Sequence, residues 1–197
     1  MRLTTLISGW FFCDLLAHGR EMEQVIARGD NSLLQHSTPE LERWFDKPPS
    51  ELPRQNGFPL AFVLLFFLIA FACNLLTLMS MLPRQTPPTR ALLFFLPAIL
   101  FIFSNLTATW LIARGKTSGL AWYGLVHGVL TVLSAVLLAI TVLNGQMHHA
   151  VIMLVAILIM LACRYVLNGR GFILFVLYSR TQRIATLSRG MRIRSGQ

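Results

Sequence analysis

The stretch FPLAFVLLFFLIAFACNLLTLMSML, residues 58–82, decides the fold class because it contains no charged side chain. An apolar run of about 20 residues is long enough to cross the hydrocarbon core of a bilayer as a helix. Pro59 lies in the first turn, where an amide has no partner in the helix, and Pro83 follows the last residue, where it stops the helix. The sequence therefore predicts a transmembrane helix over residues 58–82.

Three further apolar runs follow and are joined by short polar links. They cover residues 91–113, 119–143 and 150–169. The 197-residue chain is 55% hydrophobic and 13% charged, with a mean hydropathy of +0.62, whereas soluble domains carry about 25% charged residues. We therefore predict an all-α integral membrane protein with four transmembrane helices in an antiparallel bundle.

The segments on either side of the spans divide the chain into three parts. Residues 1–57 form an N-terminal cytoplasmic or interfacial segment, residues 58–179 the membrane domain, and residues 180–197 a basic cytoplasmic tail. Residues 3–17 are apolar but too short to span, so we expect an interfacial helix there. Residues 172–179 are shorter still, and they either lie in the interface or extend the fourth helix.

A helix start is visible within the N-terminal segment. Ser37, Pro39 and Glu40 match the S-x-x-E capping box, with Ser37 as the N-cap. Trp44 and Phe45 then give the short helix an apolar side. This side either docks onto a partner or packs onto the membrane domain or lipid heads.

The net charge of +9 is unevenly distributed, because every acidic residue lies between Asp14 and Glu51. With four spans, the basic residues gather on the side of the two termini, and Arg84 and Arg90 lie on the other side. The positive-inside rule then places both termini in the cytoplasm of a multi-pass inner-membrane protein. Basic residues that flank apolar spans predict contact with anionic lipid rather than with nucleic acid, and we expect lipid-head contacts from Arg170, Arg180 and Arg183.

Polar residues within the spans are candidates for function, because they are costly in lipid unless they are satisfied. Ser104, Asn105, His127 and Arg164 fall on the same side of the span centres by residue count. One hypothesis is a pocket for an anionic group. The alternative is that Arg164 extends to the interface while Asn105 and His127 bond between helices.

Small residues follow one side of the third span. They are Gly124, Gly128, Thr131 and Ala135. Such residues let another helix approach closely, either within one protomer or between protomers.

Metal, cofactor and catalytic motifs are not recognised in the sequence. Adjacent histidines such as His148 and His149 point about 100° apart on a helix, and the adjoining loop has no Cys, Asp or Glu. We therefore expect no metal, no cofactor and no catalytic residue.

These patterns favour a non-catalytic membrane protein that acts through protein or lipid partners, as an accessory, sensor or immunity-type subunit. The expected partners are anionic lipids and either another protein or a second copy of this chain. The alternatives are a pore or transporter component for an anion or lipid, and a subunit of a lipid- or envelope-modifying enzyme.

Overall fold

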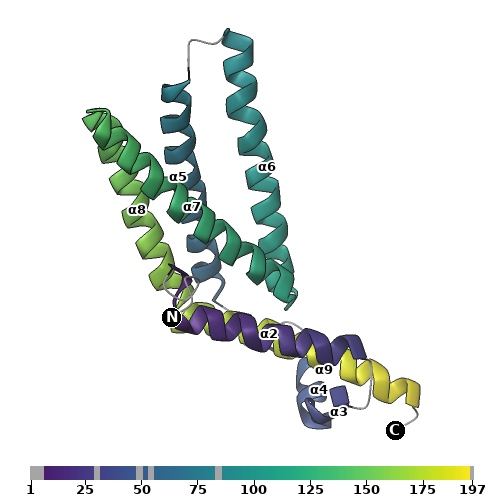
Figure 1. The fold of residues 1–197 in the computed structure, drawn as a ribbon. Helices are drawn as coiled ribbons and strands as arrows, with labels where there is room; N and C mark the ends of the chain where they lie inside the picture. The colour runs from purple at the N-terminus through teal and green to yellow at the C-terminus, as the bar shows by residue number, and fades with distance from the viewer. Residues whose placement is uncertain (1–6, 29–31, 48–50, 53–55, 83–85, 196–197) are drawn as a thin grey trace.

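The computed structural model describes residues 7–28, 32–47, 51–52, 56–82 and 86–195, and over these ranges it is helical with no strand. Four helices are long and apolar enough to cross a membrane, as the sequence predicts for a multi-pass membrane protein. They are α5 (Phe58–Met81), α6 (Pro87–Ala113), α7 (Thr117–Leu143) and α8 (Met147–Leu167). Successive members of this set run in opposite directions (Figure 1).

The observed boundaries differ from the predicted ones mainly at α6. This helix begins at Pro87 rather than at residue 91, because proline is tolerated in the first turn, where its missing N–H has no helical partner. The fourth span begins at Met147 and ends at Leu167, with Asn168 as its C-cap.

The core of the bundle lies among α5, α7 and α8. Phe67 and Tyr123 are fully buried there and make an edge-to-face contact at 5.1 Å. α6 is less enclosed, and Phe101 on α6 stacks on Phe71 of α5 at 4.1 Å. Most of the α6 surface is apolar and exposed, as expected for a helix that faces lipid.

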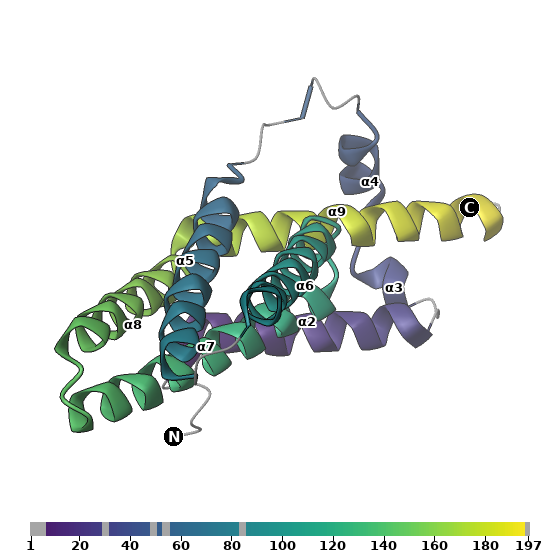
Figure 2. The same cartoon turned by 90° about the horizontal axis from the view of Figure 1, so that it is seen from above.

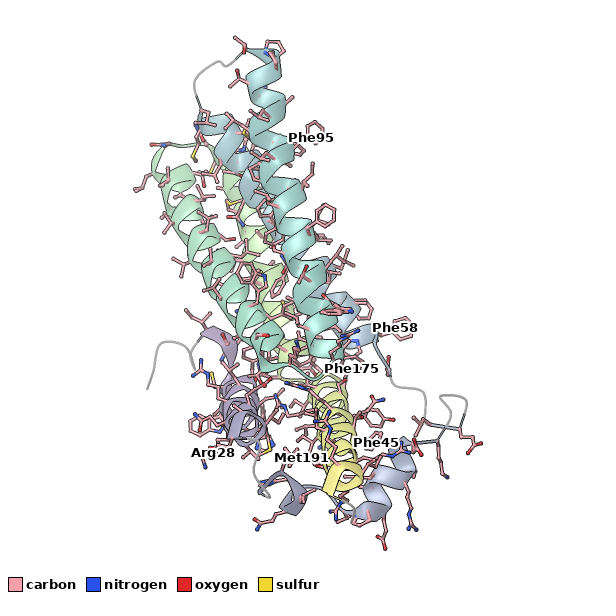
Figure 3. All side chains as sticks on the ribbon, turned by 90° about the vertical axis from the view of Figure 1, so that its right-hand side faces the viewer. Arg28, Phe45, Phe58, Phe95, Phe175 and Met191 are labelled. Atoms are coloured by element: carbon pink, nitrogen blue, oxygen red, sulfur yellow. The ribbon has the colours of Figure 1, made fainter. Side chains whose placement is uncertain are left out.

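The remaining helices gather at one end of the spans, and we name them together the terminal platform. They are α2 (Trp10–Arg28), α3 (Ser32–Gln35), α4 (Pro39–Phe45) and α9 (Arg170–Ser195). α2 and α9 cross this end of the bundle in the same direction (Figures 1 and 2). Figure 3 shows Phe175 where the bundle meets the platform, and Phe45 and Met191 farther out in it.

α9 is one helix across the boundary that we drew between residues 179 and 180. Its buried side follows a four-residue spacing through Phe172, Val176, Arg180, Ile184 and Ser188. The stretch 172–179 therefore does not extend α8, which ends before α9 begins in a new direction (Figure 1).

The N-terminal helix also extends beyond the expected residues 3–17. In α2 the buried positions Phe12, Leu15 and Gly19 form one stripe, and the helix continues to Arg28. Residues 3–6 of the expected helix and residues 196–197 of the expected tail lie outside the described ranges.

Candidate functional site

The junction between α2, α9 and the loop from α6 to α7 is built around Glu23 and Arg183. The Arg183 guanidinium donates to both carboxylate oxygens of Glu23, at 2.6 and 3.1 Å. Glu23 Oε1 also accepts from the backbone N–H of Thr117 at 3.1 Å, and Arg183 Nη1 donates to the carbonyl of Gly115 at 3.3 Å. The pair therefore bonds to both sides of the loop.

The two charges match the helix ends that they meet. Glu23 lies at the first residue of α7, where the free N–H groups and the helix dipole favour an anion. Arg183 lies just past the end of α6, where free carbonyls favour a cation. Burial alone would raise the pKa of Glu23, but the bonds from Arg183 and Thr117 and the charge of Lys116 outweigh it, so this pKa lies below its ordinary value.

Two glycines allow the backbones to approach at this junction. Gly115 has a φ of +69°, and a Cβ there would lie 2.5 Å from the carbonyl oxygen of Ser179. A Cβ on Gly19 would lie 2.5 Å from Arg180 Nη2. A larger residue at either position would push the loop or α2 away from α9.

Arg180 lies inside the junction, with only 4% of its surface exposed. Its Nη1 donates to the carbonyl of Leu15 at 3.3 Å, and its Nε is buried without a hydrogen-bond partner among the described residues. Burial and the neighbouring Arg183 lower the pKa of Arg180, and the Glu23 carboxylate opposes them. The structure thus places Arg180 and Arg183 against α2, while Arg170 at the start of α9 is exposed.

A cavity of about 480 Å³ opens where the end of α6 meets α9. Its polar lining comes from Arg114, Lys116, Ser179, Gln182, Arg183 and Thr186. The described lining contains basic side chains and hydroxyl groups but no carboxylate. The Arg114 guanidinium lies over the Trp110 ring, 4.1 Å from its centroid.

Two further ion pairs join α4 to α9. Arg189 pairs with Asp46, and Arg192 Nε donates to Glu42 at 3.1 Å. The Glu42 carboxylate is nearly buried, with 6% of its side chain exposed. The acids of the N-terminal segment therefore neutralise arginines of the predicted basic tail.

The apolar side of α4 packs onto the same helix. The ring of Tyr178 lies 5.2 Å from that of Phe45 and 6.1 Å from that of Trp44, both in edge-to-face geometry. The N-cap of α4 is Thr38 and not Ser37, because Thr38 has an extended backbone and its Oγ1 accepts from Leu41 N at 3.2 Å. The sequence predicted either docking onto a partner or packing onto the membrane domain or lipid heads, and the structure shows packing onto α9.

Asn168 holds the start of α2 at the corner between α8 and α9. Its Oδ1 accepts from Phe12 N at 3.1 Å, and its Nδ2 donates to the carbonyls of Ser8 and Arg164, each at 2.8 Å. Gly9 passes this side chain with a φ of +91°, and a Cβ there would lie 2.2 Å from Asn168 Nδ2.

Three of the four polar residues of the predicted intramembrane cluster have side chains next to backbone carbonyls. Ser104 Oγ and Asn105 Nδ2 donate to the carbonyl of Phe101 on their own helix. His127 Nε2 lies 3.2 Å from the carbonyl of Met160 on α8. Because a carbonyl only accepts, this nitrogen carries the proton.

Arg164, the fourth member of that cluster, is half-buried, and no hydrogen bond joins any two of the four described residues.

Two side-chain bonds between spans were not predicted. Asn74 Nδ2 on α5 donates to Ser134 Oγ on α7 at 2.8 Å, and Thr109 on α6 lies 2.6 Å from the Tyr123 hydroxyl on α7. The partners are 60 and 14 positions apart and lie on different helices, so the depth of each residue in its span was the available signal.

One end of the predicted small-residue face of α7 packs against α2, and Gly128 on the same face meets open space. A Cβ on Gly124 would lie 3.0 Å from the Phe12 ring of α2, so this position packs within the protomer. A Cβ on Gly128 would meet nothing within 4 Å, and Ala135 is exposed. The Thr131 hydroxyl donates to the carbonyl of His127 within α7.

The rings of His148 and His149 lie 5.6 Å apart, edge to face. In the part of the chain that the structure describes, no group of three or more His, Cys, Asp or Glu side chains could hold a metal ion.

Comparison with family models, with curated proteins and with solved structures found no match for this chain. Its function is therefore argued from its own residues.

Proposed function

We propose that this chain is a non-catalytic inner-membrane protein that acts through a protein or lipid partner at its terminal platform, as an accessory, sensor or immunity-type subunit. One observation carries the proposal: three ion pairs bring both ends of the chain into one folded body across a single end of the spans. The outer side of this body carries exposed charges such as Asp14 and Glu21, which offer a polar surface to a partner.

The position of the basic residues supports a cytoplasmic platform. Arg114 and Lys116 lie in the loop beside it, whereas Arg90 lies at the start of α6, toward the other end of the antiparallel bundle. The positive-inside rule then places the platform and both termini in the cytoplasm. α2 and α9 would lie along the membrane surface at this end of the spans.

The contacts within the membrane favour this function over a pore or transporter component. The side chains of Asn74, Thr109 and His127 each bond to a neighbouring helix, which is a packing role. An enzyme subunit remains a further alternative, with chemistry supplied by a partner.

The test is purification of the crosslinked protein in mild detergent, with identification of the bound proteins by mass spectrometry. Asp14→Asn with Glu21→Gln alters the outer side of α2. Asn144→Asp with Gln146→Glu changes two charges at the opposite end and serves as the control. We expect a defined partner with the parent and the control, and its loss with the α2 variant.

The contradicting result is a partner that is retained equally by all three proteins. Flux of an anion or lipid through liposomes that contain only this protein would instead support the pore alternative.

A further inference from the structure

Positive charge is in excess at the junction of the α6–α7 loop with α9. Arg114, Lys116, Arg180 and Arg183 gather there. The Glu23 carboxylate pairs with Arg183 and lies within electrostatic range of Lys116 and Arg180. Its oxygens are already bonded to Arg183 and to the backbone of Thr117. Like charges at one site repel each other unless a counter-ion joins them, so this junction favours an additional anion. Arg183 is half-buried there, and Arg114 and Lys116 are exposed to such an anion.

The cavity beside these residues has the size and lining to hold that anion. Its volume of about 480 Å³ lies within the usual range for small-molecule sites. Arg114, Lys116 and Arg183 supply N–H donors, and Gln182 on the exposed side of α9 supplies a neutral amide. A phosphate group accepts several such bonds at once, and it pairs well with a guanidinium.

The surroundings of the cavity favour a lipid as the source of that phosphate. Trp110 is half-exposed on α6 beneath the Arg114 guanidinium, as expected of an aromatic side chain at the membrane interface. A guanidinium stacked on a ring keeps its in-plane N–H groups for other acceptors. Farther along α6, Phe103 and Leu106 expose an apolar surface on which acyl chains can lie.

We propose that this cavity binds the phosphate of an anionic phospholipid head group, held by Arg114, Lys116 and Arg183. The inference rests on the proposed function in taking a lipid as one partner. It also assigns the site to the end of α6 and to one side of α9, whereas the sequence suggested Arg170, Arg180 and Arg183.

The test measures the apparent Tm of the detergent-solubilised full chain. The probes are short-chain phosphatidylglycerol, short-chain phosphatidylcholine and inorganic phosphate. Arg114→Gln with Lys116→Gln removes two lining cations and leaves the Glu23–Arg183 pair intact. Arg20→Gln with Lys47→Gln removes one arginine and one lysine from exposed platform positions and is the matched control.

We expect phosphatidylglycerol, but not phosphatidylcholine, to raise the Tm of the parent and the control, because a ligand that binds the folded state stabilises it. In the cavity variant the apparent Kd should rise about tenfold or more. If the double variant does not fold, the single variants R114Q and K116Q replace it. Native mass spectrometry then counts the lipid that each protein retains.

An equal response of the parent and the cavity variant to phosphatidylglycerol overturns the proposal, as does an equal response of the parent to phosphatidylcholine. A shift with inorganic phosphate that depends on Arg114 and Lys116 supports the phosphate site and makes the free anion its ligand. Because the pure protein is used, a failure to find a protein partner does not affect this result.

Discussion

The Arg183 guanidinium donates two hydrogen bonds to the carboxylate of Glu23, which lies 160 positions earlier in the chain. The same two groups bond to the backbone N–H of Thr117, the first residue of α7, and to the carbonyl of Gly115, just after the end of α6. One ion pair therefore fixes α2, α9 and a loop of the membrane bundle relative to each other.

The stabilisation from the Glu23–Arg183 pair should depend on which of the two positions carries the acid and which carries the base. Glu23→Gln should lower the free energy of unfolding by roughly 1–2 kcal/mol, after allowance for partial exposure. Exchanging the pair, with Glu23→Arg and Arg183→Glu, should not restore the Tm, because each charge would then meet the wrong helix end.

The exposed pair of Asp46 and Arg189 is the control for this exchange. Its side chains are 48% and 46% exposed, so Asp46→Arg with Arg189→Asp should stay close to the parent Tm. Equal recovery in both exchanged pairs would show that only the attraction between the charges matters at Glu23.

The contribution of Glu23 should depend on pH. Its pKa in the folded protein lies below the ordinary value of 4.5, so its stabilising effect is complete above that pH and is lost as the pH falls through the lower folded value. The Tm difference between the parent and Glu23→Gln should therefore persist at neutral pH and shrink in acid. A difference that grows below pH 4.5 would contradict this assignment.

The Asn168 side chain should control the position of the start of α2. Asn168→Ala removes its three hydrogen bonds, at a cost of about 1–3 kcal/mol. Half-buried Cys13 should then react faster with a water-soluble maleimide, as followed by peptide mass mapping. Asn144→Ala, at the exposed C-cap of α7, should leave the labelling rate unchanged.

The two glycines of the small-residue face should respond differently to a large side chain. Gly124→Leu should displace Phe12, cost about 1–3 kcal/mol and increase Cys13 labelling. Gly128→Leu should leave both the Tm and the labelling unchanged, because its side chain enters open space. Loss of a crosslinked oligomer with Gly128→Leu alone would identify this position as a contact between protomers.

The first turn of α4 should depend on Thr38. Thr38→Ala should destabilise the short helix by about 1 kcal/mol, seen as faster amide hydrogen exchange at residues 40–45. Ser37→Ala should have little effect, because the buried Ser37 hydroxyl has no hydrogen-bond partner within the described ranges. The reverse order of effects would restore Ser37 as the cap.

The four spans were predictable because membrane crossing depends on local composition. A run of apolar residues needs no information about its neighbours, and the α4 helix needed only a cap and a proline nearby. The predicted cap is one residue early, since Ser37 and Thr38 both carry a hydroxyl and only the structure shows that Thr38 accepts from Leu41 N.

The candidate site could not be predicted in the same way. The partners of Arg183, Arg189 and Arg192 lie about 140 to 160 positions earlier in the chain, and no spacing rule connects them. The buried side of α9 was also hard to recognise from its sequence, because Arg180 occupies one of the buried positions.

The contact between Phe12 and Asn168 sets an order of events during synthesis. At 5–20 residues per second, about 8–31 s separate the emergence of two residues 156 positions apart. Until then α2 lacks its bond to Asn168. The ring of Phe12 must meanwhile contact another apolar surface, such as the membrane or a chaperone. A ribosome that stalls within the fourth span therefore leaves a chain in which α2 cannot pack. A protease can recognise such an incomplete chain by its unpacked helix.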